Sequence, residues 1–418
     1  MSPDARRALA DALPREAFRE PLDGTWAVGG AVPLAVVEPG SSEEVRAVLA
    51  AASAGGFTVV PLGGRTDPGA EPPRGPFVVL STQRFAGIEA YEPADLTVTA
   101  GAGTTLASLG AALAEKGQWL PVDPPFAPDR TVGGLVATGA AGPLGMAYGA
   151  PRDHVLGLTV VSGDGQVLRL GGRVMKNVAG FDLVKLMVGS RGTLGVVVSA
   201  TLRVFPRPAD DRAVVLEADG PAALLGAAQE VRAAAVVPAS AVLVSPPPGG
   251  APGRSALVVR VQGAPAAVEV DTRTLLGSSR SGSVSVGGEA ARRIHESVRD
   301  RAARHPLVLR AFGPAALLPE ILAAVRDAVP VEALAADVMS GRVRVGVAGD
   351  AAPEVSALRV LRTRLEALGG SLVLERAGAG LLAEVPAFGH GGRAGALGAA
   401  LRKRFDPGGV LSAGRFAP

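Results

Sequence analysis

The residue types most able to do chemistry in this chain gather between residues 171 and 197, in the stretch GGRVMKNVAGFDLVKLMVGSRGTLGVV. Asn177 is the only asparagine of the chain, and it is flanked by Lys176 and Lys185, two of four lysines in a sequence with thirty-eight arginines. This concentration of rare polar residues marks the stretch as a candidate site. The alternative is that Asn177 and Lys185 only cap and solvate a turn.

The same stretch predicts a short helix and a turn. Asp182 is placed to cap the N-terminus of a helix LVKLMV, and Gly189 ends it. The apolar face of this helix is predicted to carry Leu183, Leu186 and Met187. The following SRGTLG offers flexible backbone N–H groups and a threonine hydroxyl before a strand that begins at Val196.

Three glycine-rich segments are candidates for a phosphate site. TVTAGAGTTLASLGAALAEKG (97–117) is closest to a dinucleotide fingerprint, but Leu106 replaces its third glycine and no acidic strand end follows, which favours a plain strand–turn–helix corner. In PLGGRTDPGA (61–70), consecutive glycines let successive N–H groups point at one anion. DRTVGGLVATGAAGPLGMAYGAPRD (129–153) is costly to order unless something packs on it, and its small residues permit close approach of a nucleotide diphosphate. Each loop alone is as consistent with a tight turn as with a binding site.

The composition limits the classes of protein that fit. The 418 residues, with 48% hydrophobic content, can bury two or three cores. A net charge of +3 without a basic run excludes a nucleic-acid-binding protein. The absence of cysteine excludes disulfides, thiolate catalysis and cysteine-ligated iron–sulfur clusters in this chain. No apolar window reaches about 18 residues and the N-terminus is unlike a signal peptide, so a soluble cytoplasmic protein is expected.

The elements that must position these segments have an α+β pattern. Residues 33–66 read as strand, helix, strand and loop, with a capping box of Ser41 and Glu44 at the helix start. Further strands are predicted at LTVTAG, VLGLTVVSG and GVVVSATLRVF, with a helix from Leu106 to Glu115. PRPADD (206–211) marks a boundary. Beyond it, strands such as PLVLRAFG and SLVLERAG alternate with helices such as ALLPEILAAVRDA, as in one or two helix-on-sheet modules, and no sequence repeat is evident.

The order of these motifs resembles a known family. The P-x-G-G loop, TVGGLVATGAAG, YGAPRD, the 171–205 block and the terminal FDPGGVLSAGRF are similar to the FAD-binding oxidases of the vanillyl-alcohol-oxidase (PCMH) type, and within them to the FAD-binding subunits of bacterial glycolate oxidases. The resemblance covers residues 30–208 and about the last fifteen. It implies an α+β protein whose PCMH-type FAD-binding domain has two α+β subdomains and carries a ferredoxin-like α+β cap domain. The implied segments are an N-terminal helical segment (1–30), the FAD-binding domain (31–208), the cap (209–395) and a C-terminal segment returning to the FAD domain (396–418).

The resemblance implies FAD as the cofactor, held by residues of the segments 61–70 and 129–153 and of the 171–197 stretch. They are Pro61, Gly63, Gly64, Arg65, Thr66, Thr131, Gly133, Gly134, Ala137, Thr138, Gly139, Asp153, Lys176, Asn177, Gly180, Asp182, Gly192, Thr193, Gly195 and Val197. Gly192, Thr193 and Gly195 are expected to line the cofactor. Val197 is expected near the adenine, and Lys176 and Asn177 in the approach to the ring.

This sequence also departs from the family pattern. Arg65 replaces a glycine common in the first loop, where it pairs with a phosphate or obstructs the loop. Phe181 replaces a tyrosine and Arg191 a glutamate, and the tail reads SAG (412–414) where Asn-Pro-Gly is usual. Because neither binding loop contains histidine or cysteine, the resemblance implies non-covalent FAD.

The sequence contains fewer of the residues expected for substrate oxidation than of those expected for FAD binding. Oxidising a 2-hydroxy acid needs an arginine-type carboxylate clamp and a base for the hydroxyl proton. Catalytic subunits of this type carry a motif H-x-G-D-G-N-x-H, which this chain lacks. Its histidines, His154, His295, His305 and His390, are scattered and are expected to be structural or solvated, with His390 the best candidate base among them. No catalytic residue is assigned, and no metal site is expected.

The sequence therefore predicts the FAD-binding subunit of a glycolate oxidase-like complex. Electrons would pass to or from a catalytic FAD subunit and an iron–sulfur subunit, and any contact with the inner membrane would be made through these partners. Two alternatives stay open. One is a self-sufficient FAD-linked hydroxy-acid dehydrogenase, and the other is a non-catalytic assembly subunit that has lost the flavin.

Overall fold

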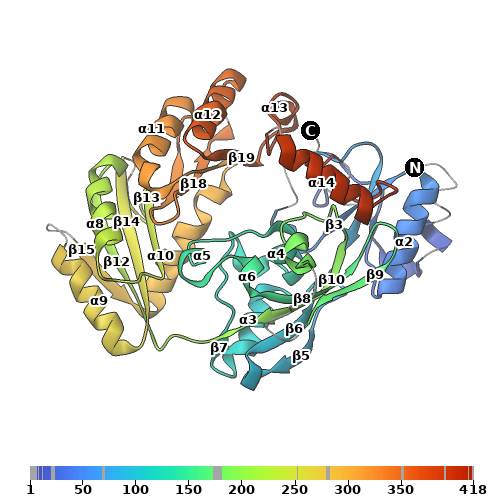
Figure 1. The fold of residues 1–418 in the computed structure, drawn as a ribbon, viewed down its shortest axis with the longest axis horizontal. Coiled ribbons are helices and arrows are strands. Elements are labelled where there is room, and N and C mark those ends of the chain that lie inside the picture. The colour runs from blue at the N-terminus through green and yellow to red at the C-terminus, as the bar shows by residue number, and fades with distance from the viewer. Residues whose placement is uncertain are drawn as a thin grey trace.

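A computed structural model describes residues 7, 9–11, 13–19, 24–67, 71–172, 181–251, 253–278, 283–349, 353–389, 392–412 and 414–416. Figure 1 shows two parts side by side: one contains both ends of the chain, and the other is formed by the middle of the chain. No helix in these ranges is both long and apolar enough to cross a membrane.

The first sheet carries the first glycine-rich loop. Its four strands follow the order β1 (Phe18–Arg19), β2 (Val36–Val37), β4 (Phe77–Ser81) and β3 (Thr58–Leu62). Strands β2, β4 and β3 run parallel, so the chain must cross over between β2 and β3, and α2 (Ser42–Gly55) makes this connection. The Ser41 hydroxyl caps α2 by accepting from the Glu44 N–H at 3.1 Å, as predicted. The Glu44 carboxylate accepts from the Gly40 N–H at 2.7 Å, one residue before the expected position.

The second sheet is antiparallel and carries the other two loops. Its strands follow the order β5 (Ile88–Glu92), β6 (Thr97–Gly101), β10 (Val196–Arg203), β8 (Val155–Val161) and β9 (Val167–Gly171). Its core also includes residues of α3 (Leu106–Ala114), α4 (Val132–Thr138) and α7 (Leu183–Met187). The short strands β7 (Gln118–Trp119) and β11 (Phe205–Pro206) pair with each other, and α5 (Gly145–Tyr148) and α6 (Pro151–His154) lie in the long loop before β8.

Helix α7 is the short helix predicted after residue 182, but its buried face differs from the prediction. Asp182 caps it by accepting a hydrogen bond from the Lys185 N–H at 3.2 Å. Val184 and Met187 are the buried residues, whereas Leu183 and Leu186 are only half-buried. The helix is therefore rotated relative to the predicted apolar face, because Val184 and Met187, three residues apart, are the pair that joins the core of the second sheet.

The middle of the chain forms one eight-stranded antiparallel sheet. Its order is β15 (Ser283–Gly287), β12 (Asp210–Asp219), β14 (Arg254–Gly263), β13 (Ser240–Ser245), β17 (Ala333–Asp337), β18 (Arg342–Val347), β16 (Leu307–Phe312) and β19 (Ser371–Arg376). With α8 (Leu225–Ala233) and α9 (Pro265–Ser278), then α11 (Leu318–Ala328) and α12 (Val355–Ala367), the chain runs twice through β-α-β-β-α-β. This is the ferredoxin-like motif, duplicated and joined through β13 and β17. The repeat is not evident in the sequence, because the two halves share their topology but no evident sequence pattern.

The two faces of this sheet are covered differently. The four helices of the repeats share one large aliphatic cluster with one face. Helix α10 (Gly288–Asp300), which connects the halves, lies on the opposite face of the first half, where Ala291 and Val298 form a separate cluster with strand residues. The opposite face of the second half faces the other part of the molecule.

The C-terminal segment returns to the first sheet. After α13 (Ala379–Glu384) and α14 (Gly392–Phe405), the chain pairs with β3. The Val59 N–H donates to the Val410 carbonyl at 2.7 Å, and the Ser412 N–H donates to the Val59 carbonyl at 2.8 Å. Asp406 is buried and accepts from the N–H groups of Val410 and Leu411, which fixes this return.

Candidate functional site

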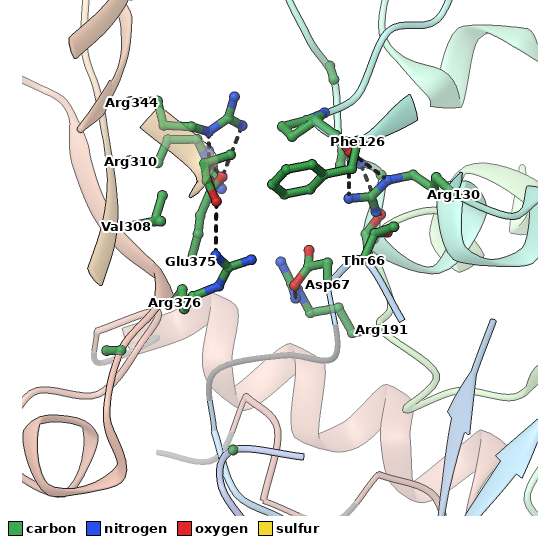
Figure 2. A pocket seen from close by; sticks show the side chains of 18 of the residues that line it. Thr66, Asp67, Phe126, Arg130, Arg191, Val308, Arg310, Arg344, Glu375 and Arg376 are labelled. Atoms are coloured by element: carbon green, nitrogen blue, oxygen red, sulfur yellow. Dashed lines mark hydrogen bonds and ion pairs between the residues drawn. The ribbon is translucent and has the colours of Figure 1, made fainter. Parts of the chain in front are cut away.

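A cavity of about 470 Å³ lies between the two parts of the molecule. Figure 2 shows side chains from both parts lining it: Thr66, Asp67, Phe126, Arg130 and Arg191 on one side, and Val308, Arg310, Arg344, Glu375 and Arg376 on the other. We call the first set, with Thr138 and Gly139, the loop wall. We call the second set, with Arg342, the sheet wall, because it comes from β16, β18 and β19.

The first glycine-rich loop leaves a run of backbone donors without protein acceptors. In the described part of the chain, the N–H groups of Gly63, Gly64, Arg65 and Thr66 donate to no other residue. Arg65 adopts a left-handed conformation, with φ of 57°, which explains why a glycine suits this position. Left-handed residues within such a run can turn successive N–H groups toward a single anion. The loop therefore has the donors that a phosphate group would need.

The Arg65 side chain neither obstructs this loop nor sits inside the cavity. Its guanidinium lies 4.3 Å from the centre of the Trp26 ring, in a cation–π contact. Arg65 is also not among the residues that line the cavity.

The second loop packs against the first so closely that glycine is required. Thr131 caps α4 by accepting from the Gly134 N–H at 3.1 Å. A Cβ on Gly63 would overlap the Thr131 hydroxyl, and one on Gly64 would overlap the Asp129 carbonyl. Helix α4 ends at Gly139, which has a left-handed φ of 58°. The glycines of the two loops thus serve close packing between backbones at the edge of the cavity.

The turn at residues 188–195, from the 171–197 stretch, is the third loop of the site and completes the loop wall. Its Gly189 N–H donates to the Val136 carbonyl at 2.9 Å, and the Arg191 N–H donates to the Ala137 carbonyl at 2.7 Å. Gly192, at a left-handed φ of 73°, lies where a Cβ would approach the Pro61 ring at 3.2 Å. The three loops, far apart in the sequence, are therefore in mutual contact.

Arg191 brings a cation to the loop wall. Its guanidinium lies 3.6 Å from the Asp67 carboxylate and 5.2 Å from the centre of the Phe388 ring. Its carbonyl accepts a hydrogen bond from Arg415 at 3.2 Å. Burial and, to a lesser extent, the nearby Arg191 charge lower the pKa of Arg415 to about 10, although the Asp67 and Glu71 charges oppose this shift. The replacement of a glutamate by Arg191, noted in the sequence, thus makes this corner of the site more cationic.

Arg130, a residue of the loop wall, also contacts the loop that contains Pro125 and Phe126. It is buried, and it donates to the Pro125 carbonyl at 3.3 Å and to the Thr138 hydroxyl at 3.0 Å. Burial lowers the pKa of its guanidinium, although the neighbouring Asp67 charge opposes that shift. Through this second hydrogen bond, Arg130 fixes the position of the Thr138 hydroxyl, and Thr138 is a predicted site residue.

The sheet wall carries a partly buried ion-pair network. Arg310 and Arg344 are direct partners across β16 and β18. The Glu375 carboxylate accepts from Arg310 Nε at 2.7 Å and from Arg344 Nε at 2.8 Å. Burial alone would raise the pKa of Glu375, but the Arg344 and Arg310 charges outweigh it and lower this pKa far below its usual value. Glu375 is therefore ionised and is a weak base.

Two further arginines complete the sheet wall. Arg376 donates to the carbonyls of Ala303 and His305 at 2.9 and 3.1 Å. Arg342 forms no side-chain hydrogen bond or ion pair with any described residue. Burial lowers the pKa of Arg342, and so does repulsion from Arg310 and Arg344. With six arginines and only Asp67 and Glu375 as acids among the described lining residues, the cavity favours an anionic ligand.

The three described histidines do not line this cavity. His295 is buried, and its Nε2 lies 2.8 Å from the Asp123 carboxylate, joining α10 to the loop before Phe126. His154 is buried against the Phe205 ring. His305 lies 3.5 Å from Glu332. The described cavity walls thus lack the imidazole base that hydroxy-acid oxidation would use, and His390 lies outside the described residues.

The predicted site residues fall into four groups. Thr66, Thr138 and Gly139 line the cavity. Most others build the three contacting loops behind it, and these are Pro61, Gly63, Gly64, Arg65, Thr131, Gly133, Gly134, Ala137, Gly192, Thr193, Gly195 and Val197. Asp153 and Asp182 instead cap their own short helices and are exposed. Lys176, Asn177 and Gly180 lie outside the described residues.

The dinucleotide-like segment at 97–117 has a packing role. A Cβ on Gly101 would overlap the Phe85 carbonyl, and one on Gly103 would overlap the Thr82 carbonyl. Neither glycine lines the cavity. The preference for a strand–turn–helix corner is supported here, because α3 follows directly with Thr105 as its cap.

The residues of the sheet wall were not predicted from the sequence. The alternation R-V-R at 342–344 in an aliphatic strand and the E-R pair at 375–376 were the available signals. They stood out little among thirty-eight arginines. Asp67, Phe126 and Arg130 were missed as well, because only the fold brings them to the cavity.

Comparisons with known proteins address the first part of the chain. Residues 33–171 match the family model described as an FAD binding domain. Glycolate oxidase subunit GlcE of Escherichia coli (strain K12) is 48% identical over 130 residues, which are 31% of this chain and 37% of that protein. D-2-hydroxyglutarate dehydrogenase of Xanthomonas citri pv. viticola is 41% identical over 186 residues, 44% of this chain and 39% of the relative. The matched region thus spans less than half the length of these relatives.

The fold can be compared over nearly the whole chain. A solved structure of alkyldihydroxyacetonephosphate synthase superposes with a TM-score of 0.75 at 16% identity, covering 99% of this chain and 85% of that one. The predicted α+β architecture with a PCMH-type FAD-binding domain is confirmed. FAD also fits the described site, because its diphosphate needs N–H donors of the kind that Gly63 to Thr66 leave free.

Proposed function

We propose that this chain, in which residues 33–171 form an FAD binding domain, is the FAD-binding subunit of a glycolate oxidase-like complex that oxidises a 2-hydroxy acid. It would hold FAD non-covalently and exchange electrons with a catalytic FAD subunit and an iron–sulfur subunit. We assign residues 31–208 and 396–418 to the FAD-binding domain and 209–395 to the cap. The location that goes with this proposal is the cytoplasm, with any contact to the inner membrane made by the partners.

The three loops support the cofactor assignment. We assign the diphosphate to the free N–H groups of Gly63 to Thr66 and to the turn at Gly192, which contact each other through Pro61. Thr138 and Gly139 line the cavity and would lie beside the ring. FAD, when bound, supplies the two-electron chemistry. Non-covalent attachment is supported by the absence of cysteine from the chain and of histidine from the described cavity lining.

The cavity supports a substrate that carries a carboxylate. Its arginines would attract and orient such an anion by charge-assisted hydrogen bonds. A hydroxyl proton also needs an acceptor, and Glu375 is a poor one because Arg344 and Arg310 hold its pKa far below the usual value. The arginine-rich lining, together with the lack of a suited base among the described lining residues, is the observation that carries the subunit proposal.

Partner subunits would supply what the chain lacks. A catalytic FAD subunit would bring the base, and an iron–sulfur subunit would bring the cysteine ligands that this sequence does not contain. The similarity of residues in the first part to a glycolate oxidase subunit supports partners of this kind.

A self-sufficient dehydrogenase is the second candidate. It is favoured by the arginine-lined cavity and by the similarity to D-2-hydroxyglutarate dehydrogenase over 44% of the chain. In that case, the base is not assigned, and His390, the best candidate among the histidines, lies outside the described residues.

Anaerobic flavin reduction distinguishes these functions. We expect the purified chain to be yellow, to release intact FAD on acid treatment, and to be reduced by glycolate or D-lactate about 10² to 10⁴ times more slowly than the assembled complex. Rapid bleaching of the isolated chain by either acid would favour the self-sufficient dehydrogenase. A colourless protein that cannot be reconstituted with FAD would leave only an assembly role.

A further inference from the structure

Glu375 occupies an irregular position in the sheet. Along the β16–β19 ladder, Val308 pairs with Arg376 and Leu309 pairs with Leu374, so Glu375 is the extra residue of a β-bulge. A bulge turns the side chain of its extra residue away from the regular alternation, and such bulges are frequent beside active sites. This bulge is the feature that allows a β19 residue to reach the arginines of the neighbouring strands.

The carboxylate placed by this bulge binds two guanidinium groups at once. Glu375 Oε1 lies 2.7 Å from Arg310 Nε, and Oε2 lies 2.8 Å from Arg344 Nε, with a further contact of 3.3 Å to a terminal nitrogen of Arg344. Arg344 is buried, and the side chain of Glu375 is 20% exposed. Both carboxylate oxygens are therefore already engaged.

Two arginines that converge on a cavity are an arrangement suited to a ligand carboxylate. Planar guanidinium groups match a carboxylate in two-point geometry, which gives strong and oriented binding. Here the two groups line the same cavity as Thr66 and Arg130 of the loop wall (Figure 2). A side chain of the protein itself holds the position that a small acid would take.

We propose that Glu375 is a built-in carboxylate that occupies the Arg310–Arg344 clamp and keeps small carboxylic acids out of it. The inference rests on the proposed function in one respect, that this cavity is the substrate side of the flavin site. It gives a structural reason why the isolated chain would not process a hydroxy acid. The low pKa of Glu375 supports it, because the carboxylate stays charged and bound throughout the physiological pH range.

Removal of the Glu375 side chain should turn the clamp into a binding site for acetate. The experiment measures the thermal unfolding midpoint of the full-length, FAD-loaded protein while acetate replaces chloride at constant ionic strength. We expect Glu375→Ala to unfold several degrees below wild type in chloride and to regain more than half of that loss in acetate. The wild-type midpoint should change little, apart from a small shared response through Arg342.

Two further variants test whether the effect belongs to the clamp. Glu384→Ala removes an exposed carboxylate at the end of α13 that pairs with Arg359 of α12, and it should show no response to acetate. Glu375→Gln removes the charge but keeps the clamp filled, so it should fold, unfold at a lower midpoint than wild type, and gain less from acetate than Glu375→Ala. It also keeps the test valid if Glu375→Ala does not fold, because an unchanged midpoint in Glu375→Gln would overturn the proposal.

The outcomes separate this inference from the proposed function. If Glu375→Ala responds to acetate no more than wild type does, or if wild type is stabilised by acetate as strongly, Glu375 does not guard the clamp. Flavin content measured on the same samples tests the proposed function alone. Loss of FAD from the wild-type protein would contradict that function without changing the acetate result.

Discussion

The two walls of the cavity bind their surroundings by different means. The loop wall offers mainly backbone groups, held in place by glycines that pack against Thr131, Asp129 and Pro61. The sheet wall offers charged side chains on regular strands, with Glu375 between Arg310 and Arg344. A backbone site tolerates changes of side chain but not of conformation. A site made of side chains tolerates small changes of backbone conformation but not the loss of a charged side chain. We therefore expect the loop wall to be sensitive to substitutions that strain the backbone, and the sheet wall to substitutions that remove charge.

The largest effect is expected on the sheet wall. Glu375→Gln leaves two guanidinium groups without their counter-ion. Because the network is partly buried, we expect a loss of free energy of unfolding between the ~1 kcal/mol of an exposed pair and the ~3 kcal/mol of a fully buried one. Urea unfolding monitored by circular dichroism measures this loss. The exposed pair Arg359 and Glu384 provides the matched control, since Glu384→Gln should cost less than about 1 kcal/mol. Equal losses in the two variants would show that the sheet wall has no special role in stability.

On the loop wall, conformation should matter most. Gly192→Val places a β-branched residue at a φ of 73° beside the Pro61 ring. Such strain costs about 1–3 kcal/mol, which the turn would relieve by moving, so FAD affinity should fall about tenfold to a hundredfold. Flavin absorbance during titration of the apoprotein measures this.

Gly110→Val in α3 is the control for this substitution, because a Cβ there has open space around it. Gly195 is not suited to the same test. A Cβ at Gly195 would overlap Val160 and so disturb the second sheet itself. Unchanged flavin affinity in Gly192→Val would mean that the turn lies outside the flavin site.

The Asp123–His295 contact, which joins α10 to the loop before Phe126, should be sensitive to pH. Burial lowers the pKa of His295, although Asp123 opposes the shift, so folded His295 binds a proton less readily than unfolded His295. The unfolded state then binds more protons below about pH 6.5, and the free energy of unfolding falls as the pH is lowered from 7 to 5. Each such histidine contributes at most about 1.4 kcal/mol per pH unit.

His295→Gln tests this contribution. His154, whose pKa burial also lowers, adds a slope of the same sign, so the variant should keep part of the pH dependence and lose the rest. Denaturant unfolding at pH 5, 6 and 7 gives the slopes. A variant slope equal to that of wild type would show that His295 does not titrate within this range.

The smallest effect is expected at Arg65. Because its side chain stacks on Trp26 outside the cavity, Arg65→Ala should cost about 0.5–1 kcal/mol of stability and leave FAD affinity within about twofold. Isothermal titration with FAD checks the second part. A large gain or loss of affinity would place the guanidinium at the phosphate after all.

The sequence alone determined the features that depend on neighbouring residues. The capped starts of α2 and α3, the aliphatic strands and the glycine-rich loops all follow from local propensity and backbone sterics, and their order in the chain was enough for a resemblance to FAD-binding oxidases. The buried face of α7 was misjudged because a five-residue helix is too short for its periodicity to fix the side that packs.

The contacts between residues far apart in the sequence became evident only from the folded structure. Arg310, Arg344 and Glu375 come from three strands that are brought together by a duplicated sheet, and a one-residue bulge directs Glu375 toward the arginines. The Asp123–His295 contact and the return of residue 411 to β3 likewise join segments far apart in the chain. Register and long-range pairing have no local signature in a sequence, because their free energy comes from contacts that form only when the whole sheet is assembled.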